Sequence, residues 1–138
     1  SGTLGGLTRA NATPENIARA VIEGMLLNLR GGVDALRDQG AEVKRVLLIG
    51  GASASAAVQA IAPSVFGVPV AVPVSAEYVG LGAAKQAAWA LRRTADPPHW
   101  PLEFMSDSTG ADGSSDDAAI AELISRYEEL LSAVHGPH

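Results

Sequence analysis

The residues best suited to ligand chemistry lie at positions 50–55, where an apolar stretch (46–49) ends in the run Gly-Gly-Ala-Ser-Ala-Ser. Two glycines between a strand and a helix leave the backbone uncovered, so a ligand can approach it closely. The free N–H groups at the start of the helix then face an anion or a polar edge of the ligand. The pattern therefore favours nucleotide binding at this loop.

The same run also has a purely structural interpretation, a tight turn in which Ser53 or Ser55 caps the following helix. It is not a Walker loop, because no Gly-Lys-Ser/Thr follows, and it is not a dinucleotide fingerprint, because the third glycine is missing. From the residues alone, a nucleotide loop and a structural turn both remain open.

Other candidate residues have simpler structural interpretations. Ser75 fits the N-cap of a helix with Glu77 in its first turn. The run 107–110, Asp-Ser-Thr-Gly, superficially resembles a phosphotransferase loop, but it follows no strand and lies in a Ser/Gly/Asp tract. His99 has no carboxylate and nucleophile around it, so the sequence gives no support for a hydrolytic triad. The basic pairs at 44–45 and 92–93 are expected to be solvated or to complement helix ends.

Composition narrows the class of protein. The 138 residues make one domain or part of one, and the net charge of −5 gives no basic field for a nucleic acid. The absence of Cys excludes disulfides and thiolate metal sites, and three His make a poor metal set. No apolar run reaches the roughly 18 residues of a membrane span, and the start, Ser-Gly-Thr, lacks a signal pattern. We expect a cytoplasmic location, no membrane or nucleic-acid partner, and a chain that is a piece of something longer.

The first predicted element is a helix that begins with Thr13 as N-cap and Pro14 at its first position, and ends near residues 39–40. Its three glycines (24, 31 and 32) predict close approach by another backbone. The predicted inward stripe consists of Ile17, Val21, Met25, Leu29, Val33 and Leu36.

Two short strands are predicted next, at 46–49 and 68–73, with helices at 54–66 and 77–92. The first strand is apolar on both faces, as in a parallel sheet covered by helices. Gly80 and Gly82 would let the second of these helices lie close to a neighbour. Residues 94–117 read as a loop or disordered connection, and a final helix runs from about 117 to 134. We therefore expect an α/β unit at 1–93, a connection at 94–117 and a terminal helix at 118–138, with the missing strands supplied from elsewhere.

Several runs together resemble one known family. They are Val46-Leu-Leu-Ile-Gly-Gly-Ala, then Ser55, Gln59 and Ala62, then Gly67-Val-Pro-Val, Glu77-Tyr-Val, Gly82-Ala-Ala and Lys85-Gln-Ala-Ala-Trp-Ala-Leu. This pattern resembles the carboxyl-terminal domain of the FGGY carbohydrate kinases, and within that family the xylulokinases. The resemblance covers about residues 2–92 well and the tail loosely.

The resemblance implies a partial actin-like (ribonuclease-H-like) carboxyl-terminal lobe, with sugar and ATP bound between two lobes. It implies transfer of the γ-phosphoryl group of Mg²⁺-bound ATP to the 5-hydroxyl of D-xylulose in the full-length enzyme. In that family the glycine loop borders the nucleotide, so Gly50, Gly51, Ala52 and Ser55 would line the adenosine and phosphate side.

The family's phosphate loop and catalytic Asp lie upstream of the matching region. The chain is therefore expected to carry no catalytic or metal-ligating residue, to be inactive alone, to need the amino-terminal lobe as partner, and to self-associate. Two alternatives remain open at this point: a non-catalytic interaction module with the kinase fold, and a nucleotide-sensing module.

Overall fold

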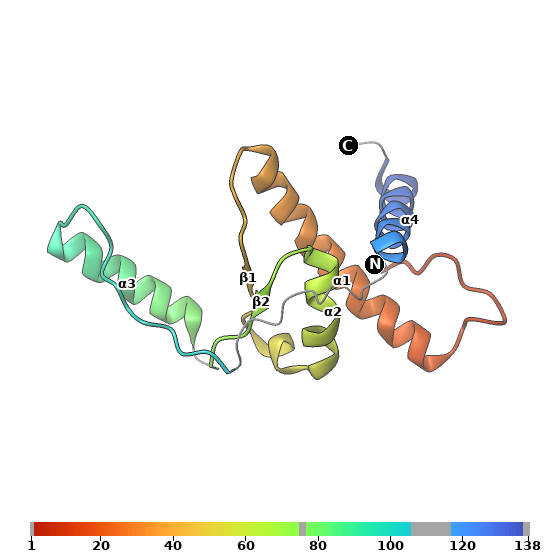
Figure 1. Cartoon of the computed structure of the whole chain (residues 1–138), viewed down its shortest axis with the longest axis horizontal. Coiled ribbons are helices and arrows are strands. Elements are labelled where there is room, and N and C mark those ends of the chain that lie inside the picture. The colour runs from red at the N-terminus through yellow and green to blue at the C-terminus, as the bar shows by residue number, and fades with distance from the viewer. Residues whose placement is uncertain (1, 75–76, 106–116, 137–138) are drawn as a thin grey trace.

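The computed structural model describes residues 2–74, 77–105 and 117–136. Its elements follow the predicted order, with a short 3₁₀ helix added after the first strand (Figure 1). They are α1 (Pro14–Asp38), β1 (Val46–Leu47), η1 (Gly51–Ala54), α2 (Ala56–Phe66), β2 (Val70–Ala71), α3 (Tyr78–Arg92) and α4 (Asp117–His135).

The predicted limits of α1 are confirmed. The Thr13 side chain accepts a hydrogen bond of 3.3 Å from the backbone N–H of Asn16, and Pro14 is the first helical residue. At the other end Gln39 is the C-cap, and Gly40 has a φ of +85°, the left-handed conformation that glycine adopts readily.

The predicted inward face of α1 is wrong for most of its members, although Val33 packs against the core. Leu26 and Leu27 are the buried residues of this helix, whereas four members of the predicted stripe are 39–57% exposed: Val21, Met25, Leu29 and Leu36. Successive residues of a helix are about 100° apart around its axis, so Met25 and Leu26 lie on two different faces. Both of these faces carry apolar residues. Periodicity does not choose between two such faces; α2 and α4 do, by packing against the one that contains Leu26.

The predicted role of the helix glycines is also wrong for the described part of the chain. A Cβ added at Gly24, Gly31 or Gly32 would meet no atom within 4 Å, and the same holds for Gly82. For Gly80 the nearest atom is the Cβ of Glu77, at 3.9 Å. No backbone of the described residues therefore uses the space that these glycines leave.

β1 and β2 pair in parallel, as predicted, with Val46 opposite Val70 and Leu47 opposite Ala71. Both strands are only two residues long, shorter than the predicted 46–49 and 68–73. Leu47 and Ile49 are exposed, so the expectation that helices cover both faces of the first strand is wrong for the described residues. Because β1 has a single neighbouring strand, its hydrogen bonds to β2 end where the chain turns away, at Gly50.

A third segment joins the outer edge of β2, within the stretch predicted as loop. Pro73 and Phe104 form an antiparallel bridge, the Val74 N–H donates to the Glu103 carbonyl at 2.8 Å, and the Met105 N–H donates to the Val72 carbonyl at 3.0 Å. An edge strand presents unpaired N–H and C=O groups that recruit such a segment. Residues 94–102 form no helix or strand, as predicted. The pairing at 103–105 departs from the predicted irregular connection, and residues 106–116 lie outside the described part of the chain.

The core lies between α1, α2 and the two strands. Its largest fully buried side chains are Phe66, Leu26 and Val65. α4 adds Leu123, Ile124 and Tyr127 to the rim of this core. α3 buries no residue and stands away from α1 and α4 (Figure 1). Among the described helices, none is both long enough and apolar enough to cross a bilayer.

Candidate functional site

The glycine loop is fixed by its own hydrogen bonds. Gly50 has φ +93° and ψ 176°, a conformation that L-residues rarely adopt, and it turns the chain from β1 into η1. Its carbonyl accepts from the N–H of Ser53 at 3.1 Å and from the Ser53 hydroxyl at 2.7 Å. The Gln59 side-chain amide donates to the Ser53 carbonyl at 2.7 Å. The bonds within the loop and the one from Gln59 of α2 therefore hold the loop in one conformation.

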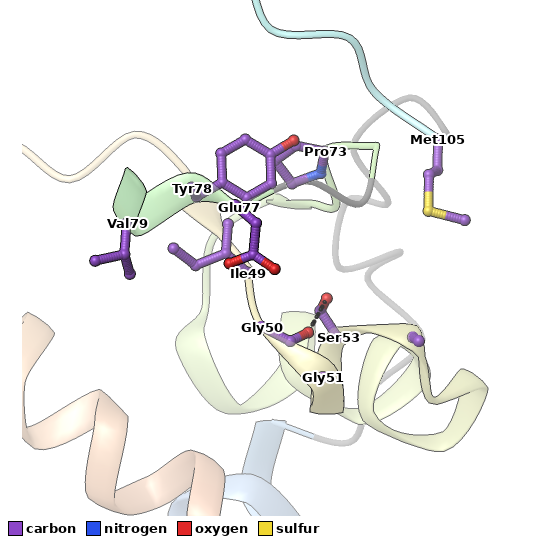
Figure 2. Close-up of a pocket in the computed structure, with 10 residues that line it drawn as sticks. Ile49, Gly50, Gly51, Ser53, Pro73, Glu77, Tyr78, Val79 and Met105 are labelled. Carbon is purple, nitrogen blue, oxygen red and sulfur yellow. Dashed lines mark hydrogen bonds between the residues drawn. The ribbon is translucent and has the colours of Figure 1, made fainter. Parts of the chain in front are cut away.

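A cleft of about 450 Å³ opens beside this loop. The start of α3 and the segment at 105 form its other sides, so three stretches far apart in the sequence contribute to it (Figure 2). Its lining residues are Ile49, Gly50, Gly51, Ser53, Ala54, Pro73, Glu77, Tyr78, Val79 and Met105.

Of the four residues predicted to border a nucleotide, Gly50 and Gly51 line the cleft, whereas Ala52 and Ser55 are not among its lining residues. Ser55 is the N-cap of α2, but its side chain makes no capping hydrogen bond. The serine that supports the turn is Ser53.

The remaining candidates lie elsewhere. Glu77 is the N-cap of α3, while Ser75, predicted for that position, falls outside the described residues, as do residues 107–110. His99 does not line the cleft. Lys44 pairs with Glu42 on the surface, and Arg93 ends α3 in the left-handed conformation with φ +54°.

Sequence reasoning gave no site role to Glu77, Tyr78, Val79 or Met105. The first three stand in a run that carried the family resemblance, so a signal for them existed. The Tyr78 hydroxyl donates to the Val74 carbonyl, which holds its ring at the cleft. Met105 had no such signal, because only the edge pairing of 103–105 brings it here.

The cleft offers a definite but limited chemistry. Its walls are mostly apolar, the glycine loop supplies bare backbone, and Glu77 supplies one carboxylate. No lysine or arginine lines it, and the described residues contain no cluster of His, Asp or Glu able to hold a metal ion. Such a cleft suits a flat group with polar edges, but it lacks the charges that stabilise a transferring phosphoryl group.

A second, more open cleft of about 900 Å³ lies between the first residues, α1 and α4. Its two arginines are already paired, Arg19 with Glu23 at 2.6 Å and Arg126 with Glu122. Among its described lining residues, each arginine thus has its charge offset by a carboxylate on its own helix.

Comparisons with known proteins agree on one family. Residues 1–91 match the model of the C-terminal domain of the FGGY family of carbohydrate kinases. A "Xylulose kinase" of Streptomyces rubiginosus is 32% identical over 137 residues, which is 99% of this chain and 26% of that protein. A "Xylulose kinase" of Haemophilus influenzae is 35% identical over 85 residues, 62% of this chain and 17% of that protein.

The solved structures give the same result. The crystal structure of xylulose kinase from Bifidobacterium adolescentis matches with a TM-score of 0.69 and 39% identity, over 91% of this chain and 24% of that chain. The prediction of a partial carboxyl-terminal lobe of the actin-like fold is thereby confirmed. The chain spans about a quarter or less of the proteins that it matches.

Proposed function

The chain belongs to the FGGY family of carbohydrate kinases, and we propose that it forms the nucleotide-side part of a kinase acting on D-xylulose. In this proposal the full-length enzyme transfers the γ-phosphoryl group of ATP to the 5-hydroxyl of the sugar. The xylulose kinase relatives support this substrate. Since the chain spans only 17–26% of their length, the sugar site and the reacting groups are assigned to the remainder of the kinase.

The observation that carries the proposal is the position of Gly50 and Gly51 on the wall of the cleft. A cleft of about 450 Å³ lies within the range of roughly 300–1,000 Å³ that ligand pockets occupy. The bare backbone of the two glycines allows close approach, and the apolar walls suit the faces of a purine base.

The Glu77 carboxylate sets the orientation of the nucleotide in this proposal. The Glu77 carboxylate extends toward the glycine loop in Figure 2, and a carboxylate accepts hydrogen bonds from ribose hydroxyls but repels phosphate. The phosphate tail is then placed away from Glu77, at the start of α2, where the free N–H groups of the helix favour an anion. The described residues hold no ligand cluster that fits Mg²⁺, so the proposal assigns the metal to the phosphates and the remainder of the kinase.

The test uses the full-length kinase carrying Gly51→Val. A Cβ at Gly51 meets no atom within 4 Å, so the fold has room for the first atom of a side chain, whereas a nucleotide on the loop would meet it. We expect the KM for ATP to rise about tenfold, equivalent to about 1.4 kcal/mol, with the KM for xylulose little changed. Gly51→Ala, with a smaller side chain, should give an intermediate value.

Both KM values are measured by coupled ADP release, together with the melting temperature. An unchanged ATP KM in a well-folded variant would remove the glycine loop from the site. Equal increases for both substrates with a lowered melting temperature would indicate that the loop serves only to turn the chain.

A further inference from the structure

The segment at 103–105 lies beyond the residues that match the family model, yet it contributes to the cleft. Pro73 and Phe104 are a non-hydrogen-bonded pair, so their neighbours make the bonds: Val74 donates to Glu103, and Val72 accepts from Met105, at 2.8 and 3.0 Å. These bonds fix the register of the segment on β2. They place Met105 at the same edge as the glycine loop.

A side-chain contact also holds the segment. The Arg45 guanidinium lies over the ring of Phe104, 5.6 Å from its centroid, in the geometry of a cation–π interaction. Arg45 directly precedes β1, so the segment is tied to both strands of the sheet. In an extended segment successive side chains point to opposite faces, so Met105 points away from the Phe104 side, and it lines the cleft.

Met105 is 62% exposed, so its side chain is open to a ligand in the cleft that it lines. In Figure 2 it lies on the side of the cleft opposite Tyr78 and Val79, with the glycine loop below them. A thioether neither neutralises phosphate nor binds sugar hydroxyls strongly, but it makes favourable contacts with aromatic rings. Of the parts of a nucleotide, the base is the one it suits.

We propose that Met105 packs against the adenine base of the bound nucleotide and that the pairing of residues 103–105 with β2 positions it there. This inference rests on the proposed function, since it takes ATP as the ligand. It adds a base-contacting residue from a segment that follows the residues matched by the family model.

The chain supplies its own control, because it has two methionines, and the second, Met25, lies on α1 and does not line this cleft. The 138-residue chain is labelled with ¹³C at the methionine methyl groups and ¹⁵N at the backbone. It is titrated with ATP, adenosine and inorganic tripolyphosphate, and Met105→Leu assigns the methyl signals. We expect the Met105 methyl to shift with ATP and adenosine but not with tripolyphosphate, and Met25 to stay still.

The amides of Gly50 and Gly51 separate the two proposals. If these amides shift with ATP while the Met105 methyl does not, the Met105 contact is wrong and the nucleotide site stands. If neither the glycine amides nor the Met105 methyl shifts at millimolar ATP, in the chain or in the full-length kinase, both proposals are wrong. If tripolyphosphate alone moves the Met105 methyl as much as ATP does, the residue senses phosphate and the base contact is wrong.

Kinetics of the full-length kinase give an independent readout. We expect Met105→Ala to raise the KM for ATP about two- to tenfold, with kcat, the KM for xylulose and the melting temperature unchanged. Met105→Leu should restore most of the affinity, because it keeps an apolar side chain of similar size. An unaltered ATP KM in Met105→Ala would overturn the inference.

Discussion

Gly50 and Gly51 are adjacent, but the backbone makes different demands on them. Gly50 has φ +93°, where any side chain is strained, while Gly51 lies in η1 at an ordinary φ with open space at its Cβ position. The structural interpretation of the loop as a turn therefore explains the first glycine. It does not explain the second glycine, Gly51, for which close approach of a ligand is the remaining reason.

This difference predicts opposite effects on the stability of the free chain. Gly50→Ala should lower the free energy of unfolding by about 1–3 kcal/mol, because it forces alanine into a glycine conformation. Gly51→Ala should be neutral or slightly stabilising, since it restricts the unfolded chain without strain. Urea unfolding followed by circular dichroism checks both variants. Equal losses would show that the two glycines serve the turn alike.

At the residue scale, the glycine loop was predictable because strand, glycines and helix are consecutive in the sequence. The role of Met105 was not, because it depends on a sheet edge that joins residues about thirty positions apart. Ser53 rather than Ser55 supports the turn because the 3₁₀ geometry of η1 brings its hydroxyl to the Gly50 carbonyl. Local propensity does not distinguish the two serines.

At the element scale, the C-terminus of α2 is held by two arginines of α1. Arg30 donates to the Val65 carbonyl at 2.5 Å and Arg37 to the Phe66 carbonyl at 3.2 Å. Asp34 lies between them and pairs with both, at 3.0 and 2.7 Å. The last carbonyls of a helix lack partners and carry its negative dipole end, so these cations stabilise both the carbonyls and the α1–α2 contact.

We predict that Arg30→Met lowers the free energy of unfolding by about 1–2 kcal/mol, because it removes a charged hydrogen bond and keeps the aliphatic stem. Arg19→Met is the matched control. Arg19 also pairs with a carboxylate four residues on, but its side chain is 66% exposed against 23% for Arg30. The control should cost less than about 0.5 kcal/mol. Denaturant unfolding of both variants checks the prediction, and equal costs would mean that the α2 carbonyls gain nothing from Arg30.

The helices were predictable because their signals are local: Thr13 and Pro14 start α1, and glycines follow α1 and α2. The lengths of the strands and the inward face of α1 were less predictable, because they depend on which elements pack against them. β1 has β2 on one side and no strand of the described residues on the other, so the predicted four-residue strand is reduced to two residues.

At the scale of the whole molecule, several apolar side chains lack partners. Val79 and Leu91 on α3 are 84% and 85% exposed, and the second apolar face of α1 is also open. Apolar surface of this extent favours association.

We therefore predict that the isolated chain self-associates, as a dimer, at roughly tens of micromolar, the range in which modest interfaces form. Sedimentation velocity over a range of concentrations measures this. Leu29→Lys on α1 and Leu91→Lys on α3, tested separately, should show which face is used through a shift toward monomer. A strict monomer at these concentrations would contradict the prediction.

The central claim is that this chain is one wall of a kinase site and that the remainder of the kinase supplies the other. The lining of the cleft contains no basic residue to stabilise phosphoryl transfer, so the wall alone should not catalyse it. A coupled ADP-release assay with ATP, Mg²⁺ and xylulose is run on the 138-residue chain and on the full-length kinase. We expect xylulose-dependent turnover from the full-length enzyme and none above the protein-free blank from the chain. Xylulose-dependent turnover by the chain alone would contradict the account. So would ADP release by the full-length enzyme at a rate that does not depend on xylulose.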